Sequence, residues 1–155
     1  GLATAFKMDG ASNRVYCMIG DGELQEGSVW EAIMFAGHNK LDNLCAVIDW
    51  NGLQIDGLVE HVVGLEPLVD KWKAFRWSPI VVDGHDITQL IGAYDTAAKT
   101  KGQPTVILAR TVKGKGVSFM ENQAGWHGIA PSVEQGRQAL LELGASEQEL
   151  IRGMP

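Results

Sequence analysis

The sequence is short of cysteine, of basic charge and of long apolar runs, and each shortage excludes a class of protein. It has 155 residues and two cysteines, Cys17 and Cys45, each inside an apolar stretch. We therefore expect buried, reduced thiols rather than a disulfide framework or a zinc site. Thirteen basic against nineteen acidic residues give a formal net charge of -6, which argues against a nucleic-acid partner. No apolar run approaches the roughly 18 residues of a membrane span, so we expect no membrane contact and a cytoplasmic location.

What remains is enough for one folded domain. Hydrophobic residues make up 45% and charged residues 21%, which are ordinary values for a globular chain. Because single domains usually run about 100–200 residues, we expect a single domain over residues 1–155.

Strand-like and helix-like patterns alternate along the chain. The strand candidates are four short apolar runs, Val15–Ile19, Leu44–Ile48, Ile80–Val82 and Thr105–Ala109. Their nearly continuous hydrophobicity favours strands that are covered on both faces. The helix candidates are a pattern opened by the capping-box sequence of Ser28 and Glu31, a stretch over Leu68–Trp77, and a helix beginning near Asp86. The alternation predicts an α/β fold with a mostly parallel sheet and helices on both faces.

The character of the chain changes after Lys113. Residues 113–131 show no hydrophobic period, and we expect a long active-site loop there. Ser132 with Gln135, and Ser146 with Glu149, have the form of capping boxes, which predict C-terminal helices over residues 132–152.

Polar residues follow two of the predicted strands. Gly20-Asp21-Gly22 comes directly after the first strand, and Asn51 follows the second about 30 residues later. Because ligands bind outside the carboxyl ends of parallel strands, an aspartate and an asparagine oxygen would meet there. Hard oxygen ligands suit Mg²⁺ or Ca²⁺, and Gly22 would let the backbone approach a phosphate. The alternative is a tight turn in which Asp21 caps the next helix, and the residues alone leave both interpretations open.

Longer segments resemble the thiamine diphosphate-dependent transketolases, and most closely their separately encoded N-terminal subunit. The similar segments, in family order, are Gly20-Asp21-Gly22-Glu23-Leu24-Gln25-Glu26-Gly27, Asn51-Gly52-Leu53-Gln54-Ile55-Asp56-Gly57, Asp83-Gly84-His85-Asp86, Thr111 to Met120, and Trp126-His127-Gly128. The resemblance covers nearly the whole chain and implies the diphosphate-type domain of the thiamine diphosphate-binding fold.

The resemblance implies a metal and cofactor site. Asp21 and Asn51 would be side-chain ligands of Mg²⁺ or Ca²⁺, and Leu53 would offer its backbone carbonyl. Gly22 would lie against the diphosphate of the cofactor, and Lys113 would lie near it. A lysine supplies a point charge on a flexible stem, which suits a phosphate.

It also implies two residues with catalytic roles. His127 would lie at the thiazolium edge and assist proton transfers, and Glu26 would lie near the subunit interface and link cofactor sites. The residues alone favour a structural, hydrogen-bonding role for His127, and solvated loop charges for Lys113 and Lys115.

The chain departs from the family pattern in two places. Asp49-Trp50-Asn51 replaces the paired asparagines, or the acid directly before the asparagine, that are usual before this motif. Gly1-Leu2 matches a point that family members reach only after a substantial N-terminal region, so we expect a truncated subunit.

The implied function is the diphosphate-binding part of a transketolase, a transferase of the pentose phosphate pathway. It would move a two-carbon ketol unit from a ketose phosphate to an aldose phosphate. Activity would require a pyrimidine-binding subunit in a homo- or hetero-oligomer, and turnover by this chain alone is not expected. Two alternatives stay open: a catalytically incompetent fragment or interaction module, and the equivalent domain of a deoxyxylulose-phosphate synthase.

Overall fold

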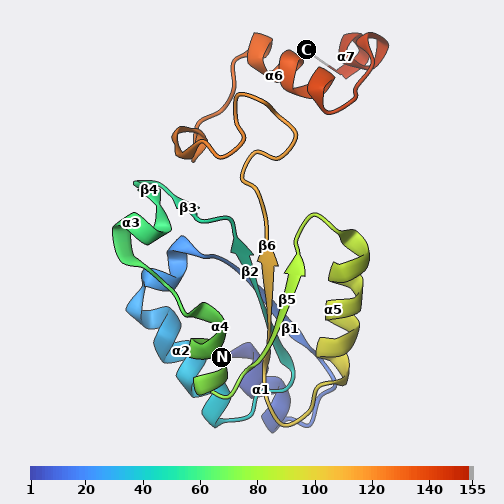
Figure 1. Ribbon diagram of the computed structural model, residues 1–155. Helices are drawn as coiled ribbons and strands as arrows, with labels where there is room; N and C mark the ends of the chain where they lie inside the picture. The colour runs from blue at the N-terminus through green and yellow to red at the C-terminus, as the bar shows by residue number, and fades with distance from the viewer. Residues whose placement is uncertain (154–155) are drawn as a thin grey trace.

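A four-stranded parallel sheet forms the body of the molecule (Figure 1). The computed structural model describes residues 1–153. Its elements in chain order are α1 (Leu2–Met8), β1 (Val15–Gly20), the 3-10 turn η1 (Gly22–Gln25), α2 (Gly27–His38), β2 (Leu44–Trp50), β3 (Leu53–Gln54), β4 (Gly57–Leu58), α3 (Val59–Val63), α4 (Leu68–Ala74), β5 (Ser78–Asp83), α5 (Ile87–Lys99), β6 (Thr105–Arg110), the 3-10 turn η2 (Ala124–Trp126), α6 (Val133–Glu142) and α7 (Glu147–Gly153).

The sheet has the strand order β1-β2-β6-β5, and all its neighbouring pairs are parallel. Helices α2 and α4 cover one face, and α5 covers the other (Figure 1). The predicted α/β class with helices on both faces is therefore confirmed. The connection after β5 leads to α5 on one face, whereas those after β1 and β2 lead to α2 and α4 on the other.

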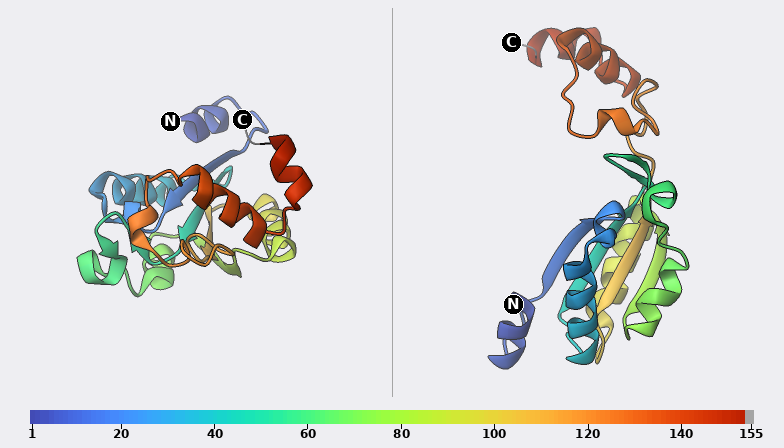
Figure 2. Two further views of the ribbon diagram at one scale, coloured as in Figure 1. Left: turned by 90° about the horizontal axis from the view of Figure 1, so that it is seen from above. Right: turned by 90° about the vertical axis from the view of Figure 1, so that its left-hand side faces the viewer.

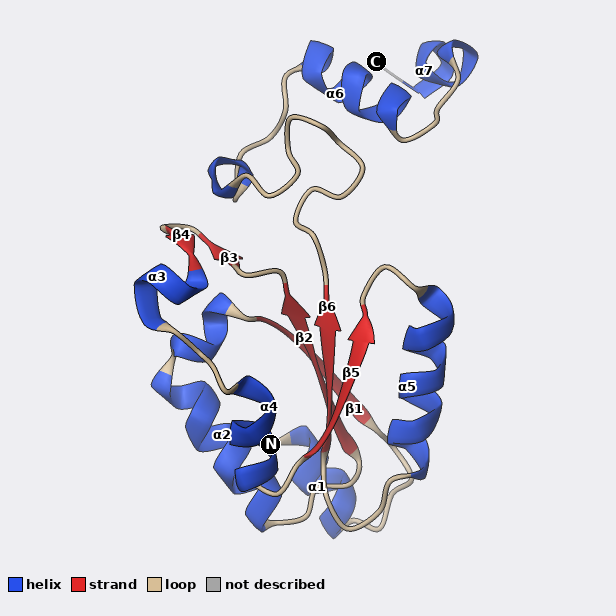
Figure 3. Cartoon of the chain, viewed as in Figure 1, coloured by secondary structure: helices blue, strands red, loops and turns tan. Residues whose placement is uncertain are grey.

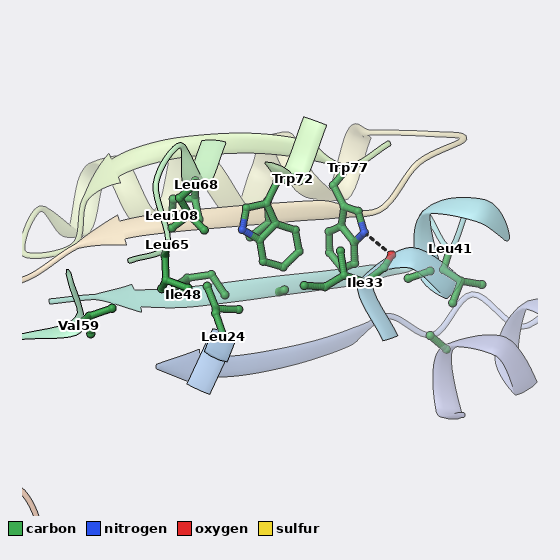
Figure 4. Close-up of a cluster of buried hydrophobic side chains, with 14 residues drawn as sticks. Leu24, Ile33, Leu41, Ile48, Val59, Leu65, Leu68, Trp72, Trp77 and Leu108 are labelled. Atoms are coloured by element: carbon green, nitrogen blue, oxygen red, sulfur yellow. Dashed lines mark hydrogen bonds between the residues drawn. The ribbon is translucent and has the colours of Figure 1, made fainter. Parts of the chain in front are cut away.

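The two central strands are buried on both faces, as their continuous hydrophobicity predicts. Ala46 of β2 and Leu108 of β6 pack against α2 and α4, whereas Val47 and Ile107 pack against α5. The larger cluster is built around Trp72 and Trp77, whose rings lie edge to face at 4.9 Å (Figure 4). Trp77 Nε1 donates a hydrogen bond to the carbonyl of Ile33, at 2.9 Å, which satisfies the buried indole.

The edge strands differ from the prediction. In β1, the side chains of Tyr16 and Met18 are 53% and 75% exposed, and Cys17 is also exposed, so only Cys45 is a buried thiol. The expectation that both cysteines are buried is wrong because β1 lies at the edge of the sheet. Burial raises the pKa of the Cys45 thiol to about 11, so it stays protonated at neutral pH.

Helix boundaries agree with the capping signals in part. Asp86 caps α5 by accepting from Thr88 N and Gln89 N, and Ser132 with Gln135 forms the predicted capping box of α6. The box predicted at Ser28 is wrong. Glu26 is the N-cap residue and α2 begins at Gly27, so Ser28 already lies inside the helix.

The long segment after β6 continues beyond the carboxyl ends of the strands. Residues 111–132 are mostly loop and lead to α6 and α7, which lie above the strand ends (Figures 1 and 3). The right-hand view of Figure 2 shows α1 at the opposite end of the molecule from this tail. Among residues 1–153, every helix is too short or too polar to cross a bilayer.

Candidate functional site

A cleft of about 420 Å³ opens at the carboxyl ends of β1 and β2. Its walls come from the turns after these strands, from the β3–β4 hairpin and from the segment after β6. All seven residues singled out in the sequence line it: Asp21, Gly22, Glu26, Asn51, Leu53, Lys113 and His127. The structure thus brings together residues that are spread over more than a hundred positions of the chain.

Asp21 joins the two strand-end turns. The register of β1 and β2 aligns Gly20 with Asp49, so the residues after them are neighbours. Asp21 is 1% exposed, and its Oδ2 accepts a hydrogen bond from the backbone N–H of Gly52 at 2.6 Å. Its Oδ1 accepts from Gly22 N at 2.9 Å. The carboxylate is therefore held in one orientation before any ligand is present.

The electrostatics of Asp21 suit a cation. Burial raises the pKa of this carboxyl, the N–H groups of Gly52 and Gly22 lower it, and the nearby Asp49 carboxylate raises it further. The net shift is upward, because burial outweighs the hydrogen bonds. A cation beside Asp21 would reverse that shift, since an opposite charge favours the ionised form.

Asn51 is fixed by a second set of bonds. Its amide Nδ2 donates to Asp49 Oδ2 at 2.9 Å, and its Oδ1 accepts from Leu53 N at 2.8 Å. Asp49 Oδ1 also accepts from the hydroxyl of Thr111, at the end of β6. In the sequence, Asp49 stands out only as a departure from the family pattern. Its hydrogen bond to Asn51, which orients that side chain, is not predicted there. The spacing of two residues between Asp49 and Asn51 at a strand end was the available signal.

Gly22 is a point of close approach. A Cβ built at Gly22 would lie 2.8 Å from Cβ of Gln54, on β3, which is well inside ordinary contact distance. The absence of a side chain lets the turn after β1 pack directly against the β3–β4 hairpin. Gly22 and Gln54 both line the cleft, so the close packing of these two segments helps to shape it.

The remaining predicted residues line the cleft from other segments. Glu26 lies at the N-cap of α2, and His127 follows η2; both side chains are exposed to solvent. Lys113 is half-buried in the cleft, whereas Lys115 pairs with Glu121 at 3.7 Å. The two lysines of this loop therefore have different surroundings.

The donor set fits a hard cation with a phosphate-bearing ligand. The side chains of Asp21 and Asn51 present oxygen atoms that backbone N–H groups already orient, and Lys113 adds a positive charge to the same cleft. Within residues 1–153, His, Cys, Asp and Glu form no cluster of three that could hold a metal ion. A cation here would take a carboxylate, neutral protein oxygens and oxygens of the ligand itself.

Comparison with known proteins finds similarity over nearly the whole chain. The family model described as "Transketolase, thiamine diphosphate binding domain" matches residues 2–151. The 6-deoxy-6-sulfo-D-fructose transketolase subunit SqwG of Clostridium sp. (strain MSTE9) is 44% identical over 143 residues, covering 92% of this chain and 52% of that one. An apulose-4-phosphate transketolase subunit of Phocaeicola vulgatus is 41% identical over 150 residues, covering 97% and 53%.

Solved structures of transketolases are also similar to this chain. The transketolase of Campylobacter jejuni superposes with a TM-score of 0.83 at 28% identity, over 97% of this chain and 25% of that one. The chain thus spans about half the length of the two subunits it matches, and a smaller share of the larger enzyme.

Proposed function

The chain belongs to the transketolase family, as a thiamine diphosphate-binding domain, and we propose that it is the diphosphate-binding part of a transketolase. In this proposal it transfers a two-carbon ketol unit from a ketose phosphate to an aldose phosphate, with a divalent metal and a pyrimidine-binding partner subunit. The observation that carries the proposal is the buried Asp21 carboxylate, hydrogen-bonded to the backbone beside Asn51 in the cleft that Lys113 lines.

We assign the metal and the diphosphate to the part of the cleft where backbone N–H groups orient the side chains of Asp21 and Asn51. Asp21, Asn51 and the carbonyl of Leu53 would hold Mg²⁺ or Ca²⁺, which keeps further oxygen ligands from the diphosphate. Gly22 would lie against the diphosphate in the same cleft, and Lys113 would neutralise the negative charge that the dication does not balance. Thiamine diphosphate supplies the electron sink when bound, and the protein contributes binding and orientation.

The proton-handling role belongs to His127 in this proposal. Its exposed imidazole lines the cleft from the loop after β6, where it could take or return a proton at the reacting end of the substrate. Glu26 lines the same cleft from the N-cap of α2, and we assign it to the contact with the partner subunit.

The names of the relatives support a partner subunit. Both matched bacterial proteins are named as subunits of transketolases, and their names give them different sugar substrates. We propose that a pyrimidine-binding subunit completes the site here too, in the cytoplasm and in pentose phosphate metabolism. Without that partner the chain binds cofactor but does not turn over substrate.

Substitutions of two aspartates in the same cleft test the metal assignment. We expect Asp21→Ala to weaken Mg²⁺-dependent thiamine diphosphate binding, followed by tryptophan fluorescence, by roughly 100-fold or more. Asp56→Ala is the matched control, because Asp56 lines the cleft but is exposed on the β3–β4 turn. Urea midpoints of both variants separate loss of the site from loss of the fold. Equal affinities for wild type and a folded Asp21→Ala chain would rule the assignment out.

The reaction is tested in the presence of the pyrimidine-binding subunit. A ketose phosphate with ribose 5-phosphate as acceptor should give two-carbon transfer. Pyruvate with glyceraldehyde 3-phosphate should give no product. The reverse preference would assign the chain to a deoxyxylulose-phosphate synthase instead.

A further inference from the structure

The turn after β5 braces the start of the long loop after β6. Gly84 N donates to the carbonyl of Arg110 at 2.7 Å, and His85 Nε2 accepts the backbone N–H of Val112 at 2.8 Å. These two bonds join residues that lie 26 and 27 positions apart in sequence. The second bond lies immediately before Lys113, the cation that lines the cleft.

The turn after β5, residues 83–85, is itself held in place by further contacts. Asp83 Oδ1 accepts the N–H of His85 at 2.9 Å, and Asp83 N donates to the side chain of Gln89, in α5, at 3.1 Å. At Gly84 a Cβ would lie 2.4 Å from Cγ2 of Thr111 and 3.0 Å from the carbonyl of Arg110. Glycine at this position therefore permits a contact that any side chain would push apart.

The segment held by this brace leads straight into the site. Thr111 donates its hydroxyl to Asp49, the residue that orients Asn51. On the far side of Lys113, its carbonyl accepts from Asn122 N at 2.9 Å. The backbone of Lys113 is thus fixed from both directions, by His85 through Val112 and by Asn122.

We propose that His85 is a positioning residue for Lys113. By accepting the Val112 N–H, its imidazole sets the backbone from which the lysine reaches the diphosphate, an inference that rests on the function proposed above. His85 lines a separate cleft, with Lys115 and Arg110, on the other side of β6. It therefore acts through the loop and touches neither the metal ligands nor the reacting atoms.

This positioning role requires a particular kind of side chain at position 85. It must present a hydrogen-bond acceptor at the reach of Nε2, which neutral imidazole does with its proton on Nδ1. Glutamine carries an oxygen at nearly that reach, whereas phenylalanine keeps a ring of similar shape without an acceptor. His85→Gln and His85→Phe therefore separate the hydrogen bond from simple packing.

The first readout is amide hydrogen exchange measured by NMR on the purified chain. We expect His85→Phe to accelerate exchange of the Val112 amide about tenfold or more, and His85→Gln to restore most of the protection. His61→Phe is the control, because His61 lies on the short helix α3 with its side chain 72% exposed. Unchanged Val112 exchange in His85→Phe would overturn the proposal, and so would a glutamine variant that exchanges like the phenylalanine one.

The second readout is affinity for magnesium pyrophosphate and for thiamine diphosphate. Loss of one positioning contact should weaken both about five- to tenfold in His85→Phe, with recovery in His85→Gln and a urea midpoint close to wild type. Faster Val112 exchange with unchanged affinity in all variants would overturn the link to Lys113. Faster exchange in a chain whose wild type binds neither ligand would uphold the brace and overturn the proposed function instead.

Discussion

Substituting Gly22 tests whether the turn after β1 packs so closely against the β3–β4 hairpin that only glycine fits there. In Gly22→Ala the new Cβ would lie 2.8 Å from Cβ of Gln54, whereas ordinary contacts begin at 3.4 Å. One of the two segments must therefore move by about 0.6 Å. Overpacking of this kind costs about 1–3 kcal/mol. Urea denaturation should show that loss as a lower midpoint with an unchanged slope.

Three further variants make the test specific. Gly27→Ala is the control, because a Cβ there faces open space at the start of α2 and should stabilise the helix by about 0.5–1 kcal/mol. Gln54→Gly removes the clashing atom, so the double variant with Gly22→Ala should recover about 1–2 kcal/mol relative to additivity. Gln54→Ala keeps that atom and should give no recovery. A Gly22→Ala chain as stable as Gly27→Ala would show that Gln54 does not crowd position 22.

Three other outcomes are expected. Gly37→Ala places a Cβ 1.9 Å from the carbonyl of Phe75 and should lower the unfolding free energy by about 3 kcal/mol, measured in urea. The N–H of Gly102, and then Lys7, hold the pKa of Asp42 below 3.8, so its stabilisation is present above that pH and lost as pH falls through the lower folded value. Urea midpoints of wild type and Asp42→Asn should therefore converge in acid. Glu142→Gln weakens the contacts to Ser118 N and Oγ, so limited trypsin digestion after Lys115 should quicken.

The central strands were predictable because their burial follows from local composition. Every residue of Leu44–Ile48 is apolar, and β2 and β6 are covered on both faces. The run Val15–Ile19 of β1 is also apolar, yet the position of β1 at the sheet edge depends on the strand order. That order is a property of distant pairings, so exposure of Cys17 could not be read from its neighbours in sequence.

Some residues of the site were predictable from the sequence pattern alone, and others only from the family resemblance. Strand ends alone indicated that Asp21 and Asn51 meet, because parallel strands finish at one edge of the sheet. Lys113 and His127 came only from the family resemblance, since the path of residues 111–132 is set by contacts such as Lys113 with Asn122. The contact of His85 with Val112 carried no local signal, because it joins the ends of two strands through a single side-chain nitrogen.

In the proposed function, this cleft binds thiamine diphosphate through a divalent metal. Calorimetric titration of the cofactor into the purified chain, first with Mg²⁺ and then with EDTA, measures this directly. We expect saturable binding with Mg²⁺ that EDTA abolishes, because the oxygens of Asp21 and Asn51 need a dication between them and the diphosphate. Binding of equal strength with EDTA would contradict it.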